Sequence, residues 1–255
     1  MKQPMPLPNK STITYIINEI LFIFYCFFSG MCYNIESVID MKYNTYIFDL
    51  DGTLLDTLLD LANAVNYAMR EMNYPERTVD EVRRFIGNGI KVLIKRAVPQ
   101  GVSDADYGKT LAIFTAYYLD HIADFTKPYD GITDVIKALK RNGCKVAVVS
   151  NKADEAAKKV VKDFFGDIFD LVVGKMDCFP SKPEPDSVLY VIETLKADRS
   201  RCIYSGDSEV DVQTAHNAGL PCVGVTWGNR DVQELVAAGA EYIANKPYEI
   251  IEKTK

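Results

Sequence analysis

Carboxylates, a lysine and hydroxyl groups stand in four short polar segments, and each segment follows an apolar run of strand-like composition. Residues 49–53 (DLDGT) follow YIF, and residues 150–151 (SN) follow KVAVV. Lys182, in SKPEPD, comes shortly after LVVG, and Asp207 and Asp211 come after CIYS. The carboxyl ends of the strands of an open parallel sheet meet at one edge, where ligands bind. We therefore expect these side chains to converge on one crevice.

These residue types suit the transfer of a phosphoryl group. Asp49 and Asp51 reach the same crevice if the backbone turns beside them, and Gly52 permits that turn. With Asp207 they form a set of three carboxylates whose repulsion demands a cation, and all-oxygen ligands suit Mg²⁺. Lys182 and a nearby hydroxyl suit an oxyanion with more than one charge, which indicates a phosphate. A carboxylate that becomes an aspartyl-phosphate is a known covalent strategy.

Each segment also has a purely structural interpretation. A DxD pair is commonly a solvated turn, SNK before a helix is an N-cap, and KPEPD is a polar loop before a helix. GDSEVD is a helix start capped by Asp207 or Ser208. Capping does not readily explain all four segments in order at successive strand ends, so the set favours one functional site.

The composition excludes several classes of function. The 255 residues are 48% hydrophobic and 25% charged, the balance of a globular protein. A formal net charge of −6 argues against a nucleic-acid partner. The chain has two histidines, His121 and His216, which disfavours a Ser-His-Asp hydrolase or a histidine-rich zinc site. Its six cysteines contain no C-x-x-C pair, which favours a reduced, cytoplasmic setting.

Residues 1–40 differ in character from the rest of the chain. Their apolar run, residues 20–28, is shorter than the roughly 20 residues that a membrane span needs. Extending the run brings in Asn18 and Glu19, which are costly inside a bilayer. Three interpretations stay open: a membrane anchor, a secretory signal, and a mis-set translation start, since Met41 begins the strand-first sequence KYNTYIFDLDG.

From Met41 onward, strand-like and helix-like runs alternate. The alternation predicts βαβ units and an α/β fold, a Rossmann-like parallel sheet flanked by helices. Residues 57–125 carry only helical patterns, so we expect an all-helical subdomain inserted into a core made of residues 41–56 and 126–255. Strands are expected at 46–48, 145–149, 171–173, 202–204, 222–225 and 242–244, and helices at 132–141, 154–165, 186–196, 209–218 and 231–238.

The four segments resemble the motifs of the haloacid dehalogenase-like (HAD) hydrolase superfamily. FDLDGTLLDT is similar to its first motif, VVSNK to the second, SKPEPD to the third and GDSEVD to the fourth. The resemblance runs from residue 44 to about residue 245 and implies a Rossmann-like core with an inserted helical cap. An aspartate at the position of Asp51 distinguishes phosphatases from dehalogenases in this superfamily. The resemblance therefore implies a Mg²⁺-dependent phosphatase that works through an aspartyl-phosphate.

The same resemblance assigns the catalytic and metal-binding residues. Asp49 is the implied nucleophile and a metal ligand. Asp51 is the implied general acid and base, and its backbone carbonyl also binds the metal. Asp207 binds the metal, and Asp211 does so directly or through water.

Further residues are implied to lie around the substrate. Ser150 and Lys182 hold the phosphoryl group, and Lys182 also offsets the charge of the nucleophile. Gly52 and Thr53 belong to the loop around the group, with Thr53 shaping this loop rather than reacting. Asn151 either contacts the substrate at the mouth of the site, together with Lys152, or caps the following helix.

Within the superfamily, the chain is most similar to the prokaryotic phosphoglycolate phosphatases, which implies 2-phosphoglycolate as substrate. The similarity lies in DLDGTLLDTLLDLANAVNYAM, FIGNGIKVLIKRAV and KPYDGITDVIKALKRNG. In the cap, Gly87, Asn88 and Gly89 precede a helix expected to begin near Ile90. This loop either offers amides to a substrate anion, with Lys91 in reach, or is a plain turn.

Other functions stay open. One alternative is a phosphatase of pyrophosphate, nucleotides or sugar phosphates, and another is a HAD-like protein that binds without turnover. The cap aromatics, Tyr118 among them, are expected to pack its helices rather than to contact substrate. The expected partner is a small phosphorylated metabolite, with no nucleic acid, and the chain is expected to be a monomer or homodimer. Membrane association is expected only if residues 1–40 are retained as an anchor.

Overall fold

The computed structural model describes residues 41–255. Residues 1–40, with the three interpretations given to them and with Cys26 and Cys32, lie outside this described part. Within residues 41–255, no helix combines the length and the apolar character needed to cross a bilayer.

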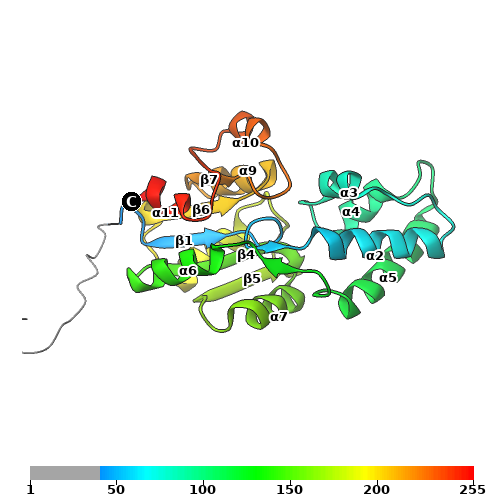
Figure 1. Ribbon diagram of the computed structural model, residues 1–255, viewed down its shortest axis with the longest axis horizontal. Helices are drawn as coiled ribbons and strands as arrows, with labels where there is room; N and C mark the ends of the chain where they lie inside the picture. The colour runs from blue at the N-terminus through cyan, green and yellow to red at the C-terminus, as the bar shows by residue number, and fades with distance from the viewer. Residues whose placement is uncertain (1–40) are drawn as a thin grey trace, which may run out of the picture. The chain divides into compact units, whose positions relative to one another are not determined.

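Six parallel strands form the central sheet, in the order β5-β4-β1-β6-β7-β8 (Figure 1). All four residues of the central strand are buried, as expected for a parallel strand covered on both faces. The predicted α/β fold, a parallel sheet flanked by helices, is therefore confirmed. The strands are β1 (Thr45–Phe48), β4 (Lys145–Ala153), β5 (Leu171–Lys175), β6 (Cys202–Gly206), β7 (Cys222–Val225) and β8 (Tyr242–Ala244).

Helices cover both faces of the sheet. Side chains of α8, α9 and α10 pack with Ile47 in one buried cluster. Tyr46 points to the opposite face, because side chains alternate along a strand, and there its hydroxyl bonds Thr254 of α11. The helices of this part are α6 (Ile132–Arg141), α7 (Asp154–Phe165), α8 (Asp186–Thr194), α9 (Glu209–Asn217), α10 (Val232–Ala238) and α11 (Glu249–Thr254).

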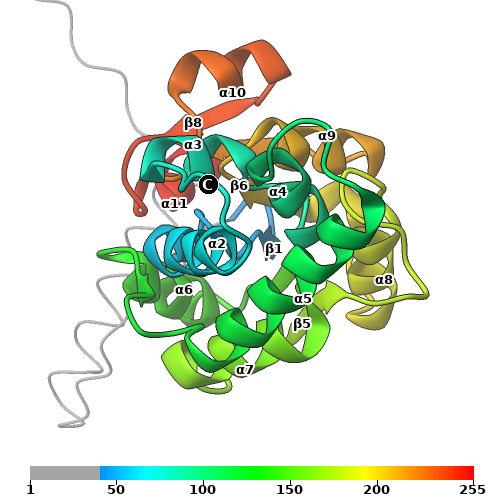
Figure 2. The same cartoon turned by 90° about the vertical axis from the view of Figure 1, so that its right-hand side faces the viewer.

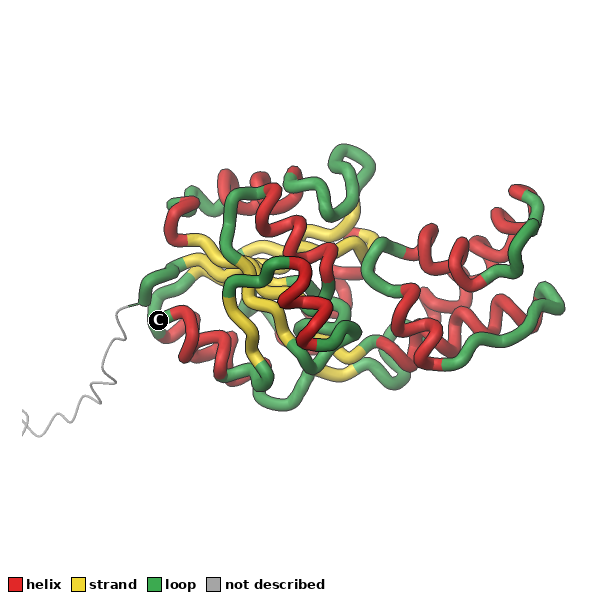
Figure 3. The backbone as a smooth tube through the Cα atoms, turned by 90° about the horizontal axis from the view of Figure 1, so that it is seen from above, coloured by secondary structure: helices red, strands yellow, loops and turns green. Residues whose placement is uncertain are grey.

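Four helices between β1 and α6 lie beyond the carboxyl ends of the strands (Figures 1 and 2). A capping box between Thr78 and Glu81 begins the second of them, and Ser103 caps the fourth. Figure 3 shows this part as helices and loops without strands. The helices are α2 (Leu58–Glu71), α3 (Val79–Phe85), α4 (Ile90–Ala97) and α5 (Asp104–Asp120).

Several short elements and boundaries differ from the sequence-based expectations. Strand β4 continues to Ala153 instead of ending at Val149, because its pairing with β5 resumes after a register shift between these two residues. The antiparallel pair β2 (Leu55–Asp56) and β3 (Lys127–Pro128), where the chain enters and leaves the four helices, was not expected. The 3₁₀ turn Arg199–Arg201 and the helix α11 were not expected either. The two-residue strands β2 and β3 carry too little periodicity to be distinguished from loops in the sequence.

Candidate active site

The site lies where the chain reverses its direction across the sheet. From the central strand β1, the order runs to β4 and β5 on one side and to β6, β7 and β8 on the other. The crevice at such a reversal, outside the carboxyl ends of the strands, is the usual ligand site of an open α/β sheet. Asp49 and Asp51 follow β1, Ser150 lies near the end of β4, and Asp207 follows β6. Lys182 joins them from the loop between β5 and α8.

The ammonium group of Lys182 links two carboxylates. Its Nζ atom lies 2.7 Å from Oδ1 of Asp49 and 2.7 Å from Oδ1 of Asp211. It also donates to the hydroxyl of Tyr204, at 3.0 Å. Burial lowers the pKa of Lys182, but the charges of Asp211 and Asp49 outweigh burial and hold this pKa well above its usual value. The group is therefore a permanent cation beside the expected nucleophile.

Three buried carboxylates form a cluster suited to a cation. One oxygen from each of Asp49, Asp207 and Asp211 lies within 4.8 Å of the others. Burial and the charge of Asp211 raise the pKa of Asp49 well above its usual value and that of Asp207 to about 7. These raised pKa values show that the positive charge of Lys182 does not fully offset burial and the mutual repulsion of the ionised carboxylates. The donor set, all oxygen and more negative than the one lysine offsets, fits a hard divalent cation such as Mg²⁺.

Two glycines let the carboxylate-bearing segments approach one another. Gly52 has φ +87°, and a Cβ atom added there would lie 2.3 Å from Oδ2 of Asp207. At Gly206, an added Cβ would lie 2.2 Å from the Cβ of Asp211. No side chain fits at either position, so both glycines are required for the cluster to close.

The two oxygens of the Asp211 carboxylate have different partners. Asp211 accepts hydrogen bonds from the backbone and hydroxyl of Ser208 in a capping box at the start of α9. Its other oxygen, Oδ1, binds Lys182. One oxygen of this carboxylate therefore belongs to the cap of α9, as the structural interpretation of GDSEVD predicts, and the other faces Lys182.

Thr53 and Gly52 lie behind the carboxylates rather than on the cavity wall. Thr53 is fully buried, and its hydroxyl is 3.4 Å from Oδ1 of Asp207. Its carbonyl accepts a hydrogen bond from the indole of Trp227, at 3.0 Å. Neither residue is among those that line the cavity.

The register shift in β4 directs three consecutive side chains toward the site. Ser150, Asn151 and Lys152 all line the cavity, although alternate residues of a regular strand face opposite sides. Asn151 donates to the carbonyls of Gly87 and Lys182, and its Oδ1 accepts from the amide of Lys182. The N-cap of α7 is Ala153, so Asn151 does not cap that helix. Instead it joins the second and third motifs to the loop after α3.

The second aspartate of the first motif has a different cation. Nζ of Lys152 lies 3.0 Å from Oδ1 of Asp51, an ion pair without hydrogen-bond geometry. The same Nζ donates to the hydroxyl of Tyr118, on α5, at 2.5 Å. Tyr118 is buried and stacks on Phe114, as expected of a packing residue, but it also lines the cavity, which was not expected.

A cavity of about 50 Å³ lies between the strand ends and the four helices. Its apolar walls come from α2, α4 and the segment after α3, and its polar walls come from the strand ends and from Tyr118. Of the loop after α3, Gly87 and Gly89 line it and Asn88 does not, while Lys91 is exposed outside it. The lining residues are Asp49, Asp51, Leu61, Ile86, Gly87, Gly89, Ile90, Leu93, Tyr118, Ser150, Asn151, Lys152 and Lys182.

Sequence reasoning missed two residues that support the carboxylates. Asn229 donates its backbone amide and its side-chain amide to Oδ2 of Asp207, at 2.6 and 2.8 Å. Tyr204 lies inside β6 and places its hydroxyl 3.3 Å from Oδ1 of Asp211. The position of Asn229 after a strand end was a usable signal. A tyrosine inside a buried strand gives none.

The chain matches known proteins over most of its described length. The sequence profile of the haloacid dehalogenase-like hydrolase family matches residues 46–225. A phosphoglycolate phosphatase of Pseudomonas putida is 34% identical over 187 residues, which cover 71% of this chain and 69% of the relative. One of Aquifex aeolicus is 33% identical over 183 residues, which cover 71% and 84%. A solved structure from Lactobacillus delbrueckii subsp. bulgaricus, assigned as a phosphoglycolate phosphatase, has a TM-score of 0.80 and 35% identity, covering 84% of this chain and 99% of that one.

The chain therefore belongs to the haloacid dehalogenase-like hydrolase family, as its four motifs predicted. Together with the relatives, this membership identifies an enzyme of the phosphoric monoester hydrolase class rather than a binding protein without turnover.

Proposed function

We propose that this enzyme is a Mg²⁺-dependent phosphatase that hydrolyses 2-phosphoglycolate through an aspartyl-phosphate formed on Asp49. The observation that carries the proposal is the buried contact of Lys182 with Asp49 and Asp211 at the strand ends. It gathers a carboxylate nucleophile, a fixed cation and a set of metal-ligand oxygens at one point. This combination suits phosphoryl transfer, in which catalysis is mostly positioning and neutralisation of charge.

In the first step, an oxygen of Asp49 attacks the phosphorus atom of the substrate. Lys182 orients this carboxylate through Oδ1, which leaves Oδ2 without a hydrogen bond from residues 41–255 and free to attack. The bond between phosphorus and the ester oxygen breaks as the alcohol leaves. Asp51 enters this step protonated, and so not as the ionised partner of Lys152, and gives its proton to the ester oxygen. Ser150 donates its hydroxyl to one oxygen of the transferred group. Lys182, whose three donors point to Asp49, Asp211 and Tyr204, neutralises the charge of that group from beside it.

In the second step, water replaces Asp49 on the phosphorus. Asp51, now ionised, takes a proton from the water as the water attacks. The bond between phosphorus and Asp49 breaks, so phosphate leaves and both aspartates return to their starting states. Asp51 thus serves as acid and then as base, as the reverse proton transfers of the two steps require.

Asp49, Asp207, Asp211 and the backbone carbonyl of Asp51 would hold the magnesium ion. When bound, the ion withdraws charge from the phosphoryl oxygens and relieves the repulsion among the carboxylates. Asn229 and Thr53 fix the orientation of Asp207 for this task.

The helices α2–α5 act as the cap in this proposal, with residues 57–125 as the cap and residues 41–56 and 126–255 as the core. Two core side chains hold the segment that ends α3. Asn151 binds the carbonyl of Gly87, and Arg230 binds the carbonyls of Arg83 and Ile86. The cap thereby closes the cavity over the strand ends and limits the water that reaches it.

The size and lining of the cavity support a small substrate. A volume of about 50 Å³ beside the strand ends leaves room for a few water molecules, which suits a small group next to the phosphoryl group. The cap walls Leu61, Ile86, Ile90 and Leu93 are aliphatic and offer no side-chain partner to the hydroxyls of a sugar. These features favour a short phosphomonoester over a nucleotide or hexose phosphate.

A screen of phosphate release tests the proposal. The panel contains 2-phosphoglycolate, pyrophosphate, mononucleotides and hexose phosphates, each measured with Mg²⁺ and with a chelator. We expect 2-phosphoglycolate to have the highest kcat/KM and the chelator to abolish release. A preference for another member would overturn the substrate, and release that persists in the chelator would overturn the metal dependence.

We also propose a reduced, cytoplasmic setting. Four cysteines in residues 41–255 are free, and three of them, Cys144, Cys202 and Cys222, are buried. Burial raises the pKa of the Cys222 thiol well above its usual value, so this group stays protonated and inert.

A further inference from the structure

The cavity contains a second buried cation that the proposed chemistry does not use. Of the residues that line the cavity, two are cations, Lys182 and Lys152. Lys182 already binds the carboxylates of Asp49 and Asp211. Lys152 contacts one carboxylate, that of Asp51, and its side chain is 5% exposed.

The groups around Lys152 leave hydrogen-bond donors available. An ammonium group has three N–H donors. One points to the hydroxyl of Tyr118 at 2.5 Å, and Asp51 lies at 3.0 Å without the geometry of a hydrogen bond. Because the Tyr118 oxygen accepts this bond, its own O–H remains a donor. The ammonium and the phenol therefore offer two adjacent donors to a ligand in the cavity.

The opposite walls carry no charged side chain that could pair with a charged ligand. The cap side of the cavity consists of aliphatic side chains of α2, α4 and the segment between them, together with Gly87 and Gly89. A carboxylate placed there without a cation would be a buried, unpaired charge, which is strongly unfavourable. Lys91, the cap lysine nearest in sequence to the glycines, is exposed and does not line the cavity.

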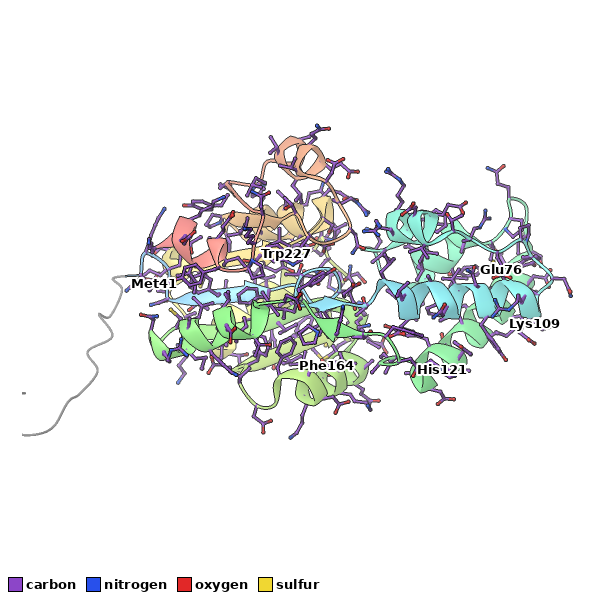
Figure 4. All side chains as sticks on the ribbon, in the orientation of Figure 1. Met41, Glu76, Lys109, His121, Phe164 and Trp227 are labelled. Carbon is purple, nitrogen blue, oxygen red and sulfur yellow. The ribbon has the colours of Figure 1, made fainter. Side chains whose placement is uncertain are left out.

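The position of Tyr118 links this subsite to the cap. Figure 4 shows His121, just after α5, at the end of the helical part nearer the sheet, whereas Glu76 and Lys109 lie at the far end. Tyr118 stands one turn before His121, so its hydroxyl meets Lys152 across the boundary between cap and core. A ligand that binds both groups therefore touches cap and core together.

We propose that Lys152 and Tyr118 form an anion subsite that binds the carboxylate of the substrate while Asp49 and Lys182 engage its phosphoryl group. The inference rests on the proposed function and deepens it, because it specifies phosphomonoesters that carry a second negative group. Lys152 is in this view a specificity-determining residue, and Tyr118 is its partner from the cap.

A pair of two-carbon substrates tests the subsite. 2-Phosphoglycolate and ethyl phosphate differ in having a carboxylate or a methyl group at the end remote from phosphorus, so the ratio of their kcat/KM values measures recognition of the carboxylate. We expect Lys152→Met to lower this ratio about tenfold to a hundredfold, the range for a lost charge-assisted hydrogen bond. Lys152→Arg should keep most of the ratio, and Tyr118→Phe should lower it several-fold. Circular dichroism establishes whether each variant is folded. If Lys152→Met does not fold, Tyr118→Phe still tests the subsite.

Lys91→Met is the matched control and should leave the ratio as in the wild type. An unchanged ratio in folded Lys152→Met and in Tyr118→Phe, with wild-type preference for 2-phosphoglycolate intact, would overturn the subsite and leave the proposed function standing. If the wild type releases no phosphate from 2-phosphoglycolate, both fail. If pyrophosphate is the preferred substrate and loses that preference in Lys152→Met, the assignment of the subsite to a carboxylate is wrong.

Discussion

The two aspartates of the first motif meet different cations, although they are two positions apart. Asp49 contacts Lys182, from the loop before α8, and Asp51 contacts Lys152, from the irregular end of β4. Asp49 also belongs to the cluster of three carboxylates, whereas Asp51 does not. Two carboxylates in different environments can take different roles, here nucleophile and proton carrier.

The raised pKa of Asp207 predicts an unusual pH dependence for the metal-free enzyme. Burial and the charge of Asp211 raise the pKa of Asp207 from 3.8 to about 7. Between these values the folded state holds a proton that the unfolded chain has lost, so the free energy of unfolding falls as the pH rises. This contribution is fully present below about pH 4 and is lost as the pH passes about 7. Thermal unfolding in a chelator should therefore show a melting temperature that falls from about pH 5 to about pH 8.

Asp207→Asn is the control for this prediction, because the amide does not titrate. Asparagine can still accept hydrogen bonds from Asn229. The variant should melt at a higher temperature than the wild type at about pH 8 in a chelator and should show a flatter pH profile. If the melting temperature of the wild type did not fall over this interval, or if the profiles of wild type and variant were parallel, the prediction would be contradicted.

The residues of the four motifs could be predicted from the sequence because each motif follows an apolar strand-like run, either directly or, for the motif with Lys182, after a short loop. Asp49, Lys182, Asp207 and Asp211 are brought together by the parallel sheet itself. Asn229 also follows a strand end, but it belongs to no motif, so its position alone did not identify a role. Its role depends on the close packing of Gly228 against Gly52 and Asp207, which only the folded chain reveals.

The segment that ends α3 is held by two elements of the core. Arg230 donates to the carbonyls of Arg83 and Ile86 and is itself oriented by Glu209, at 2.9 Å. Its neighbour Asn229 binds Asp207. One short loop therefore contacts both the carboxylate cluster and the cap, so a change in this loop affects both.

Replacing the arginine should loosen the cap. In Arg230→Met the carbonyls of Arg83 and Ile86 lose their donors, so the cavity wall formed by Ile86 and Gly87 becomes mobile. We expect KM for 2-phosphoglycolate to rise about tenfold, corresponding to one or two hydrogen bonds to a charged group, with a smaller change in kcat. Steady-state kinetics measure both constants. Arg84→Met, on the exposed side of α3, is the matched control and should behave as wild type.

The first turn of α2 anchors the segment that returns from the cap. The buried carboxylate of Asp60 accepts hydrogen bonds from the amides of Phe125 and Thr126 and from the Thr126 hydroxyl. No pattern in the sequence announces this contact, because it joins residues 65 positions apart. It holds together the two segments through which the chain enters and leaves the four helices α2–α5.

Removal of that anchor should cost stability. Asp60→Ala leaves the amides of Phe125 and Thr126 without acceptors, and we expect the free energy of unfolding to fall by about 3 kcal/mol. Urea unfolding followed by circular dichroism measures the change. Asp120→Ala removes an exposed carboxylate of α5 and should change stability by less than about 0.5 kcal/mol. Equal effects of the two substitutions would show that the hydrogen bonds of Asp60 do not stabilise the junction.

Elements with a clear apolar or helical pattern were predicted well, and irregular ones were not. Helices 132–141 and 154–165 and strands 222–225 and 242–244 have the predicted bounds. The end of β4 was missed because SNKA does not continue the apolar pattern of KVAVV, and pairing with β5 alone extends the strand. That irregular end brings Ser150, Asn151 and Lys152 to one cavity.

Across the whole molecule, the α/β fold follows from the alternation of strand-like and helix-like runs, since that alternation demands a parallel sheet with crossover helices. The strand order could not be predicted from this alternation. It depends on β1 pairing with both β4 and β6, which are about 100 and 157 residues further along the chain by register. The same central position of β1 creates the crevice in which Asp49 lies. The site is thus a consequence of topology as much as of the motifs.

Transfer of the phosphoryl group to Asp49 can be observed directly. Enzyme mixed with 2-phosphoglycolate and Mg²⁺, quenched in acid within one turnover and digested, should yield a peptide containing Asp49 that carries one phosphoryl group by mass spectrometry. Asp49→Asn should remain folded, give no such peptide and lose phosphate release by about a thousandfold or more. A phosphorylated peptide from another part of the chain, or undiminished turnover by folded Asp49→Asn, would contradict the assignment of Asp49 as the nucleophile.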